Sequence, residues 1–240
     1  MKRYAILAML LTLLVGVTVW ITQMDRIGIY MAFSYKDLLY HTYAHLRMVG
    51  VAVAVATAIG VPLGVLVTRP GLEKLAIPVI GGAGIGQTIP SLAVITIMAP
   101  VLGFGLQSAV VALVLYGILP IIRNSYTSIS SIDRRILEAA RKMGMSRMKV
   151  AWKIELPMAR PVIMAGIRIS TVITVGTAEL AVLVGGSGLG KITLTGVFAR
   201  EALLIVQGAA PTAALAISLS FLLEQLENWM TPRGLKIEES

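Results

Sequence analysis

The sequence contains no cysteine among its 240 residues. That absence excludes disulfides, thiolate metal sites and thiol nucleophiles, and it leaves the redox state of the compartment unreadable. Charged residues are also scarce: they make up 14% of the chain, whereas a soluble domain carries about 25%. Hydrophobic residues reach 57%, and the mean hydropathy is +0.84. This composition is typical of an integral membrane protein.

Acidic residues are outnumbered by Lys and Arg, 12 to 21, which gives a formal charge of +9. In a soluble protein this excess would suggest nucleic acid as a partner. In a membrane protein, however, basic residues mark the cytoplasmic ends of the spans. We therefore expect membrane lipid, and no nucleic acid, as a partner.

Charge-free windows of about 20 residues predict the spans, because that length crosses the hydrocarbon core. Spanning segments must satisfy their backbone internally, so we expect an all-α protein with about six transmembrane helices. The predicted order is a first transmembrane helix over 1–22, an outer interfacial segment over 23–47, a core over 48–223 and a cytosolic tail over 224–240. The spans of the core are predicted at 48–67, 75–99, 106–122, 161–184 and 202–223.

Local signals refine this order. The N-terminus has no small-x-small cleavage site before Asp25, so we interpret it as a retained helix rather than a signal peptide. Pro100 and the turn-like Gly103–Gly105 divide one long apolar window into two spans. Ser34 and Asp37 have capping-box spacing, which predicts a helix lying on the outer surface. The glycine-rich segment 185–201 is expected to dip back toward the bundle.

The distribution of Lys and Arg predicts the orientation. With the N-terminus inside, the basic residues left outside are few. They are Arg26, Lys36, Arg47, Lys191 and Arg200. Six spans then place both termini and the loop 123–160 in the cytoplasm of a bacterial or archaeal cell, as a multi-pass protein of its cytoplasmic membrane.

The cytosolic loop 123–160 is too well patterned to be a simple connector. Ser130, three positions before Asp133, offers an N-terminal cap for a first helix, which Gly144 ends in the left-handed conformation. Ser146 caps a second helix, and Pro157 is expected to stop it. A solvated basic loop would explain the charge of this segment, but not the Gly and Pro residues at the predicted helix ends.

The motif in this loop resembles that of a known family. Glu138-Ala139-Ala140, Gly144 and Ile154-x-Leu156-Pro157 match the EAA loop of binding-protein-dependent ABC importer permeases. Further segments are similar to the osmoprotectant branch, the glycine betaine, carnitine and choline permeases. They are Gln87–Ala93, Leu102–Gly105, Tyr116–Pro120 and Gly186–Gly190. Methionine and other amino-acid importers share the loop, so they remain an alternative.

The resemblance implies a MetI-like permease fold with cytosolic coupling helices. It implies a transmembrane subunit that moves a compatible solute inward by alternating access. It also implies three partners: ABC ATPase subunits, an extracytoplasmic substrate-binding protein and a second, identical or homologous permease. The chain itself is expected to have no enzymatic activity and no cofactor, with ATP and Mg on the ATPase. The residues implied to couple to the ATPase are Glu138, Ala139, Ala140, Gly144, Ile154, Leu156 and Pro157.

Candidates for a solute path lie within the spans. Gln87, Thr88 and Ser91 place polar groups beside Pro90, and broken spans often form transport sites. An ordinary proline kink satisfied by Thr88 explains the same residues. Glu179 either lines the path or snorkels to the end of its span. Arg168 lies on nearly the same helix face, but ~16 Å of helix rise separates the two residues, so they cannot pair directly.

Three other patterns have simpler explanations. Gly185-x4-Gly190-Lys191 nearly forms a P-loop, but Ile192 stands where Ser or Thr should bind magnesium, so we expect no nucleotide site. His41 and His45 are one helical turn apart without a third ligand, and we interpret them as polar interface residues, with no metal site. A secondary transporter is disfavoured because the most organised polar element is cytosolic, and an intramembrane enzyme because no nucleophile and base can be placed together.

Overall fold

The computed structural model describes residues 33–230, and every regular element in that range is a helix. The predicted all-α class is therefore confirmed for the described residues. The predicted first transmembrane helix and the last ten residues of the predicted tail lie outside them. The α-helices are α2 (Tyr35–Leu66), α3 (Ala76–Thr88), α4 (Ser91–Leu102), α5 (Leu106–Ser130), α6 (Arg134–Lys142), α7 (Arg147–Val150), α8 (Leu156–Ala178), α9 (Gly190–Ala199) and α10 (Ala202–Met230).

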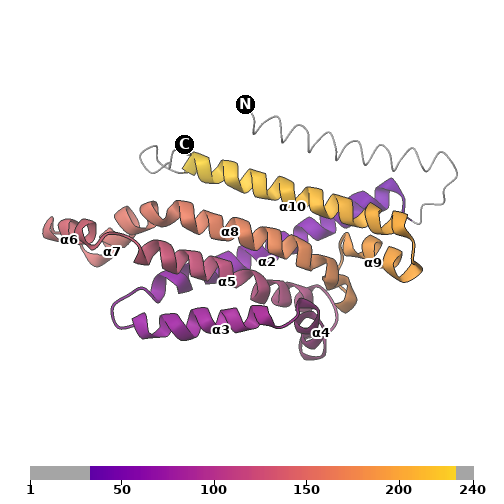
Figure 1. Ribbon diagram of the computed structural model, residues 1–240, viewed down its shortest axis with the longest axis horizontal. Helices are drawn as coiled ribbons and strands as arrows, with labels where there is room; N and C mark the ends of the chain where they lie inside the picture. Colours follow the sequence, from indigo (N-terminus) through magenta and orange to yellow (C-terminus); the bar gives the residue numbers. More distant parts are fainter. Residues whose placement is uncertain (1–32, 231–240) are drawn as a thin grey trace.

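The long helices α2, α5, α8 and α10 run side by side along the length of the molecule, with α6 and α7 at one end and α4 and α9 at the other (Figure 1). Helix α5 packs against both α2 and α8. The main buried cluster draws its side chains from α2, α4, α5 and α8 and from the 3₁₀ helix η3 (Glu179–Val184). It includes Met48, Ile95, Leu113, Val175 and Val184. This shared core holds α4 and η3 against the ends of the long helices.

Four described helical segments are long and apolar enough to cross a membrane: Tyr35–Leu66, Leu106–Ser130, Arg147–Val184 and Ala202–Met230. A fifth candidate consists of Glu73–Thr88 and Ser91–Leu102, which meet at an angle of 98°. The described residues thus hold up to five of the six predicted crossings.

The sequence predicted an outer segment over 23–47 and a separate span over 48–67. The structure shows no division between them, because one helix, α2, crosses the predicted boundary. Helix α2 runs without interruption from Tyr35 to Leu66, and no glycine or proline lies between Tyr35 and Met48 to end it at the predicted division. The predicted capping box is confirmed at its start. The Asp37 amide donates to Ser34 Oγ at 3.4 Å, and the Ser34 amide donates to Asp37 Oδ2 at 2.9 Å.

The predicted helix over 75–99 is divided at Pro90, where the sequence indicated either a broken span or a proline kink. Ile89 and Pro90 are extended, with ψ of 131° and 132°, and they separate α3 from α4. Proline disfavours the α region for the residue before it, and Ile89 accordingly leaves the helix. The second predicted division is confirmed, since Gly103 and Gly105 have φ of +84° and +134° between α4 and α5.

The loop 123–160 is more helical than predicted. Helix α5 continues to Ser130, so Ser130 is not a cap; the cap is Asp133, whose Oδ1 accepts from the Arg135 amide at 2.8 Å. Pro157 does not stop the second helix. A π-helical turn, η2 (Ala151–Glu155), leads directly into α8, where Pro157 occupies the first turn. The π-helical turn accommodates the proline, because the amide of the preceding Leu156 donates five residues back to the Ala151 carbonyl.

The far ends of the last spans also differ from the predicted bounds. The α-helical part of the predicted span 161–184 begins at Leu156 and ends at Ala178, with η3 completing it. Helix α10 continues through residues 224–230, which were assigned to the tail. The glycine-rich segment 185–201 forms the short helix α9, which packs against α10 and η3.

Candidate functional site

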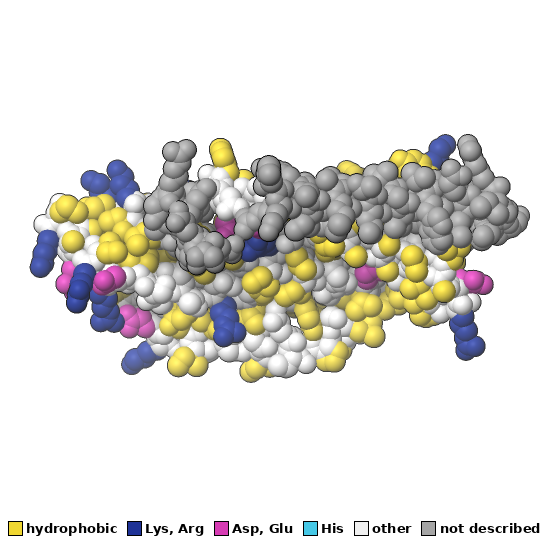
Figure 2. Space-filling model, turned by 45° about the horizontal axis from the view of Figure 1, so that its top comes forward, with side chains coloured by type: hydrophobic (Ala, Val, Ile, Leu, Met, Phe, Trp, Pro, Cys, Tyr) yellow, Lys and Arg dark blue, Asp and Glu magenta, His cyan; other side chains and the backbone are white. Residues whose placement is uncertain are grey.

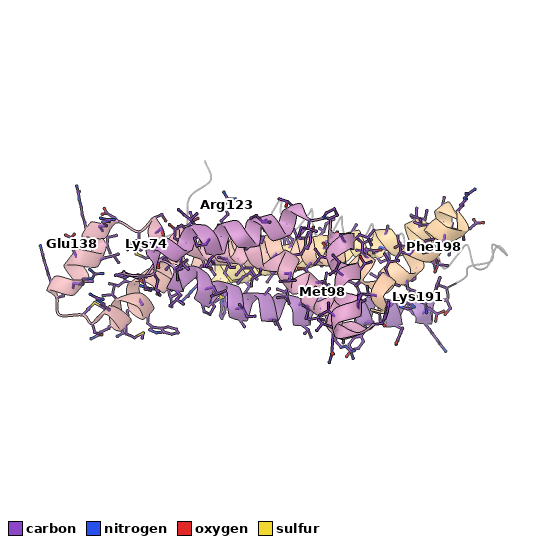
Figure 3. The ribbon with its side chains drawn as sticks, turned by 90° about the horizontal axis from the view of Figure 1, so that it is seen from below. Lys74, Met98, Arg123, Glu138, Lys191 and Phe198 are labelled. Atoms are coloured by element: carbon purple, nitrogen blue, oxygen red, sulfur yellow. The ribbon has the colours of Figure 1, made fainter. Side chains whose placement is uncertain are left out.

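The helices α6 and α7 and the turn η2 form one projecting unit, which we call the coupling segment (residues 134–157). Lys and Arg gather at this end of the molecule (Figure 2). Glu138 and Lys74 lie at the same end, whereas Lys191 and Phe198 lie at the opposite end (Figure 3). The motif that resembled the EAA loop is therefore at the basic end of the bundle.

Gly144 shapes the coupling segment. It has φ of +80°, a left-handed value that glycine adopts without steric cost. The amide of Met145 donates to the Ala140 carbonyl at 3.2 Å, and the amide of Gly144 donates to Arg141 at 2.9 Å. These two bonds form a Schellman motif, which satisfies the last carbonyls of α6. Ser146 then caps α7 by accepting from the Lys149 amide at 3.3 Å, as predicted.

The residues of the EAA pattern fall on different surfaces. Glu138, Ala139 and Gly144 are exposed, whereas Ala140 is buried. Ile154, Leu156 and Pro157 are half-buried, and Leu156 packs against an inner cluster that contains Ile129 and Ile163. One part of the motif therefore forms an exposed surface, and the other part attaches the coupling segment to the bundle.

Three large apolar side chains of the coupling segment are exposed, although nothing in the motif pointed to them. Met143 is 74% exposed, Met148 68% and Trp152 67%. Exposed apolar side chains outside the membrane favour contact with another protein. They extend the free surface from Glu138 and Ala139 along α7 and η2.

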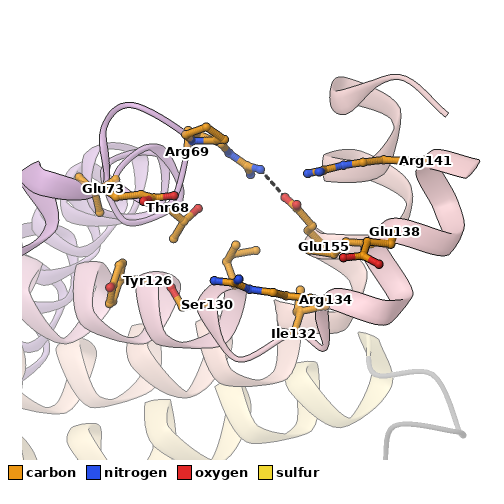
Figure 4. A pocket seen from close by; sticks show the side chains of 14 residues that line it. Thr68, Arg69, Glu73, Tyr126, Ser130, Ile132, Arg134, Glu138, Arg141 and Glu155 are labelled. Atoms are coloured by element: carbon orange, nitrogen blue, oxygen red, sulfur yellow. Dashed lines mark hydrogen bonds and ion pairs between the residues drawn. The ribbon is translucent and has the colours of Figure 1, made fainter.

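A cavity of about 590 Å³ separates the coupling segment from the bundle. Its lining includes Arg69, Glu73, Arg134, Glu138, Arg141 and Glu155 (Figure 4). Across it, Arg69 Nη1 lies 2.5 Å from Glu155 Oε2, and Glu155 is buried. Sequence reasoning missed this pair because 86 residues separate its members. The sequence did contain one signal for this pair, the charged Glu155 between the apolar motif positions Ile154 and Leu156.

The break between α3 and α4 brings together four of the predicted path residues. Gln87 Nε2 donates to the Tyr116 carbonyl at 2.8 Å, and Thr88 Oγ1 donates to the Ile85 carbonyl at 2.8 Å. Pro90 and Ser91 begin α4, and residues 88–90 are exposed. The predicted role of Thr88 in satisfying a kink therefore has a geometric basis. Beside the break, Gly82, Gly86 and Ile89 line an apolar cavity of about 460 Å³.

Glu179 does not join the other four path candidates in any hydrogen bond. Its carboxylate accepts a hydrogen bond from Thr212 of α10, and its Oε2 atom is buried without a hydrogen-bond partner. Arg168 pairs with Glu224 at 3.2 Å and with Glu227 at 3.9 Å, also on α10. The expectation that Arg168 and Glu179 do not pair is confirmed, and each attaches α8 or η3 to α10.

The prediction for His45 as a polar interface residue is wrong. His45 is fully buried, and its Nδ1 accepts from the Leu189 amide at 3.3 Å. Because an amide can only donate, the ring proton is on Nε2, which donates to the Val175 carbonyl at 3.1 Å. His41 is also buried, against the ring of Phe33. Among the described residues, no group of three or more His, Cys, Asp or Glu side chains could hold a metal.

Comparisons with known proteins agree on one family. Residues 56–234 match the model of the binding-protein-dependent transport system inner membrane component. The chain is 42% identical over 200 residues to the choline transport system permease protein OpuBB of Bacillus subtilis, covering 83% of this chain and 91% of that protein. It is 40% identical over 200 residues to the osmoprotectant import permease protein OsmW of Salmonella typhimurium, covering 81% and 92%. An inward-facing structure of the MetNI methionine ABC transporter has a TM-score of 0.74 at 27% identity, covering 83% of this chain and 100% of that one.

Proposed function

The chain belongs to the family of binding-protein-dependent transport system inner membrane components, and we propose that it is the permease subunit of an ABC importer for compatible solutes. The observation that carries this proposal is the coupling segment: a capped helix, a left-handed Gly144 and an exposed Glu138-Ala139 surface at the basic end of a helical bundle. The transported solute would be glycine betaine, carnitine, choline or a similar molecule. The names of the relatives that match most of the chain support this class.

The partners follow from the same assignment. An ABC ATPase would bind the coupling segment, through Glu138, Ala139 and the exposed Met143 and Met148. ATP and Mg²⁺ would bind to that partner, and this chain would bind no cofactor. A substrate-binding protein would deliver the solute on the opposite side, and a second permease, identical or homologous, would complete the path.

In the proposed orientation, the coupling segment and both termini would lie in the cytoplasm of a bacterial or archaeal cell. The basic residues at the end that carries α6 and α7 support this orientation, because Lys and Arg are retained on the inner side. The end with α9 and the α4–α5 turn would then face outward.

Transport would proceed by alternating access. ATP-driven closure of the ATPase would move the coupling segment and rock the helices between inward-open and outward-open states. The break at Thr88–Ser91 would lie on the solute path, because irregular backbone at membrane depth is tolerated where it lines a cavity or water. The exposed position of residues 88–90 supports this role.

A methionine importer is the second candidate, and the similarity to the MetNI transporter favours it specifically. The two candidates differ in the solute that the binding protein captures. The test is to purify the chain with the ATPase and binding protein that accompany it, and then to screen glycine betaine, carnitine, choline and methionine on the binding protein. ATP-driven uptake of a quaternary ammonium solute supports the proposal. Methionine capture would favour the second candidate, and uptake by the chain alone under an ion gradient would contradict both.

A further inference from the structure

The ion pair between Arg69 and Glu155 joins two parts of the chain that lie on opposite sides of the inner cavity. Arg69 belongs to the turn between α2 and α3, and Glu155 ends η2. Glu155 is 5% exposed, while the Arg69 side chain is 28% exposed. Within residues 33–230, the other ion pairs are those of Arg168 with α10. Arg69–Glu155 is therefore the described ion pair that connects the coupling segment to the rest of the molecule.

Both members of the pair are fixed to rigid backbone. The Arg69 amide donates to the Leu66 carbonyl at 3.0 Å, and the Arg69 carbonyl accepts from the Leu72 amide at 2.9 Å. Gly71, with φ of +89°, completes this turn. Glu155 directly precedes the first residue of α8 and ends the π-helical turn. When the backbone at Glu155 moves, the ion pair therefore passes that movement to the backbone at Arg69.

The cavity explains why this ion pair matters for the contact between the coupling segment and the bundle. About 590 Å³ of space lies between the coupling segment and the inner ends of α2 and α5, so close packing does not fill the gap there. Figure 4 shows Arg69 and Glu155 meeting across this space. A charge-assisted hydrogen bond at 2.5 Å joins the two sides across this space, beside the apolar contacts that Leu137 and Leu156 make with the bundle.

The turn that carries Arg69 leads into the broken span. Helix α3 has 13 residues and therefore transmits movement along about 18 Å to the break at Thr88. At the break, Gln87 fastens the helix to the Tyr116 carbonyl of α5. The route from Glu155 to the break thus runs through one ion pair and one rigid helix.

We propose that Arg69 and Glu155 are positioning residues that carry the movement of the coupling segment to the broken span between α3 and α4. This inference rests on the proposed function, because it needs an ATPase that moves the coupling segment. It assigns neither residue to contact with the ATPase or with the solute.

The test uses the importer reconstituted with its ATPase and binding protein, and it measures uptake per ATP hydrolysed. Arg69→Gln and Glu155→Gln should each leave the complex assembled and hydrolysing ATP, while uptake per ATP falls about tenfold, a usual size for coupling between sites. The double variant Arg69→Glu with Glu155→Arg should restore most of the lost uptake per ATP. Lys74→Gln is the matched control, because it removes one exposed positive charge from the same turn. It should match the unaltered chain.

Two results would overturn the inference: an unchanged ratio of uptake to ATP in both single variants, or a fall that the charge exchange does not restore. If a single variant does not assemble, a second design decides. The chain has no cysteine, so Arg69→Cys with Glu155→Cys adds two unique thiols for a short bismaleimide. Without the cross-linker, uptake per ATP should fall in the assembled complex, and cross-linking should restore it, because the covalent bridge replaces the ion pair. Undiminished uptake before cross-linking, or no recovery after it, would refute the link. Failure of the unaltered chain to couple with an ATPase would instead contradict the proposed function.

Discussion

Gln87 and Tyr116 fasten the broken span to α5 at the end of α3 and within the break. The Gln87 side chain donates to the Tyr116 carbonyl at 2.8 Å, and the Tyr116 hydroxyl donates to the carbonyl of Ile89 within the break. The two bonds satisfy backbone groups that lie outside regular helical bonding, which a membrane environment requires. The geometry of the break therefore depends on α5 as well as on Pro90.

Tyr116→Phe should loosen this attachment, because the Ile89 carbonyl loses its donor while the ring remains. We expect a loss of about 1 kcal/mol in the free energy of unfolding, the usual net value of one hydrogen bond. Thermal unfolding followed by tryptophan fluorescence in detergent measures it. Tyr43→Phe is the control, since Tyr43 is 65% exposed. Equal melting temperatures for the two variants would show that the hydroxyl bond contributes nothing.

Gly144→Val should abolish uptake while leaving the chain in the membrane. A β-branched residue at φ of +80° is strained, so the Schellman motif at the end of α6 is lost and the exposed Glu138-Ala139 surface moves. Membrane fractionation and solute uptake in cells measure the two properties. Gly50→Ala serves as the control, because its added methyl group meets open space. Normal uptake by the Gly144 variant would contradict the coupling role.

His45→Phe should destabilise the end of the bundle that carries α9. The variant leaves the Leu189 amide and the Val175 carbonyl without their side-chain partner in a fully buried site, and each such group costs about 1–3 kcal/mol. His41→Phe is the matched comparison, since His41 Nδ1 has no hydrogen-bond partner. Thermal unfolding of both variants measures the difference. The prediction fails if His41→Phe lowers the melting temperature as much as His45→Phe.

Gly117→Ala should separate α5 from α8. A Cβ atom at this position would lie 2.8 Å from both Ser170 Oγ and Thr174 Oγ1, closer than packed atoms tolerate. Gly176→Ala lies in α8 with open space around it, so it should gain up to about 1 kcal/mol from helix propensity. Opposite shifts in melting temperature are expected. A stabilising Gly117→Ala would show that the two helices have room to separate.

Local patterns allowed much of the site to be predicted. Gly144, Ser146 and the Ser34–Asp37 box were predicted because caps and helix stops depend on neighbours within a few residues. Pro157 was misread because proline signals both a stop and a first turn, and only the preceding π-helical turn distinguishes the two. The break at Pro90 was predicted, but its 98° bend and the hydrogen bond from Tyr116 to the Ile89 carbonyl were not.

The sequence by itself determined that this chain is an apolar, helical membrane protein with a punctuated basic loop, because hydropathy, charge and capping are local properties of the chain. Only the tertiary structure decided which polar side chains meet. Arg69 and Glu155 are 86 residues apart, and His45 and Leu189 are 144 apart. Such partners depend on how helices pack, and packing depends on the whole set of side chains rather than on any one segment.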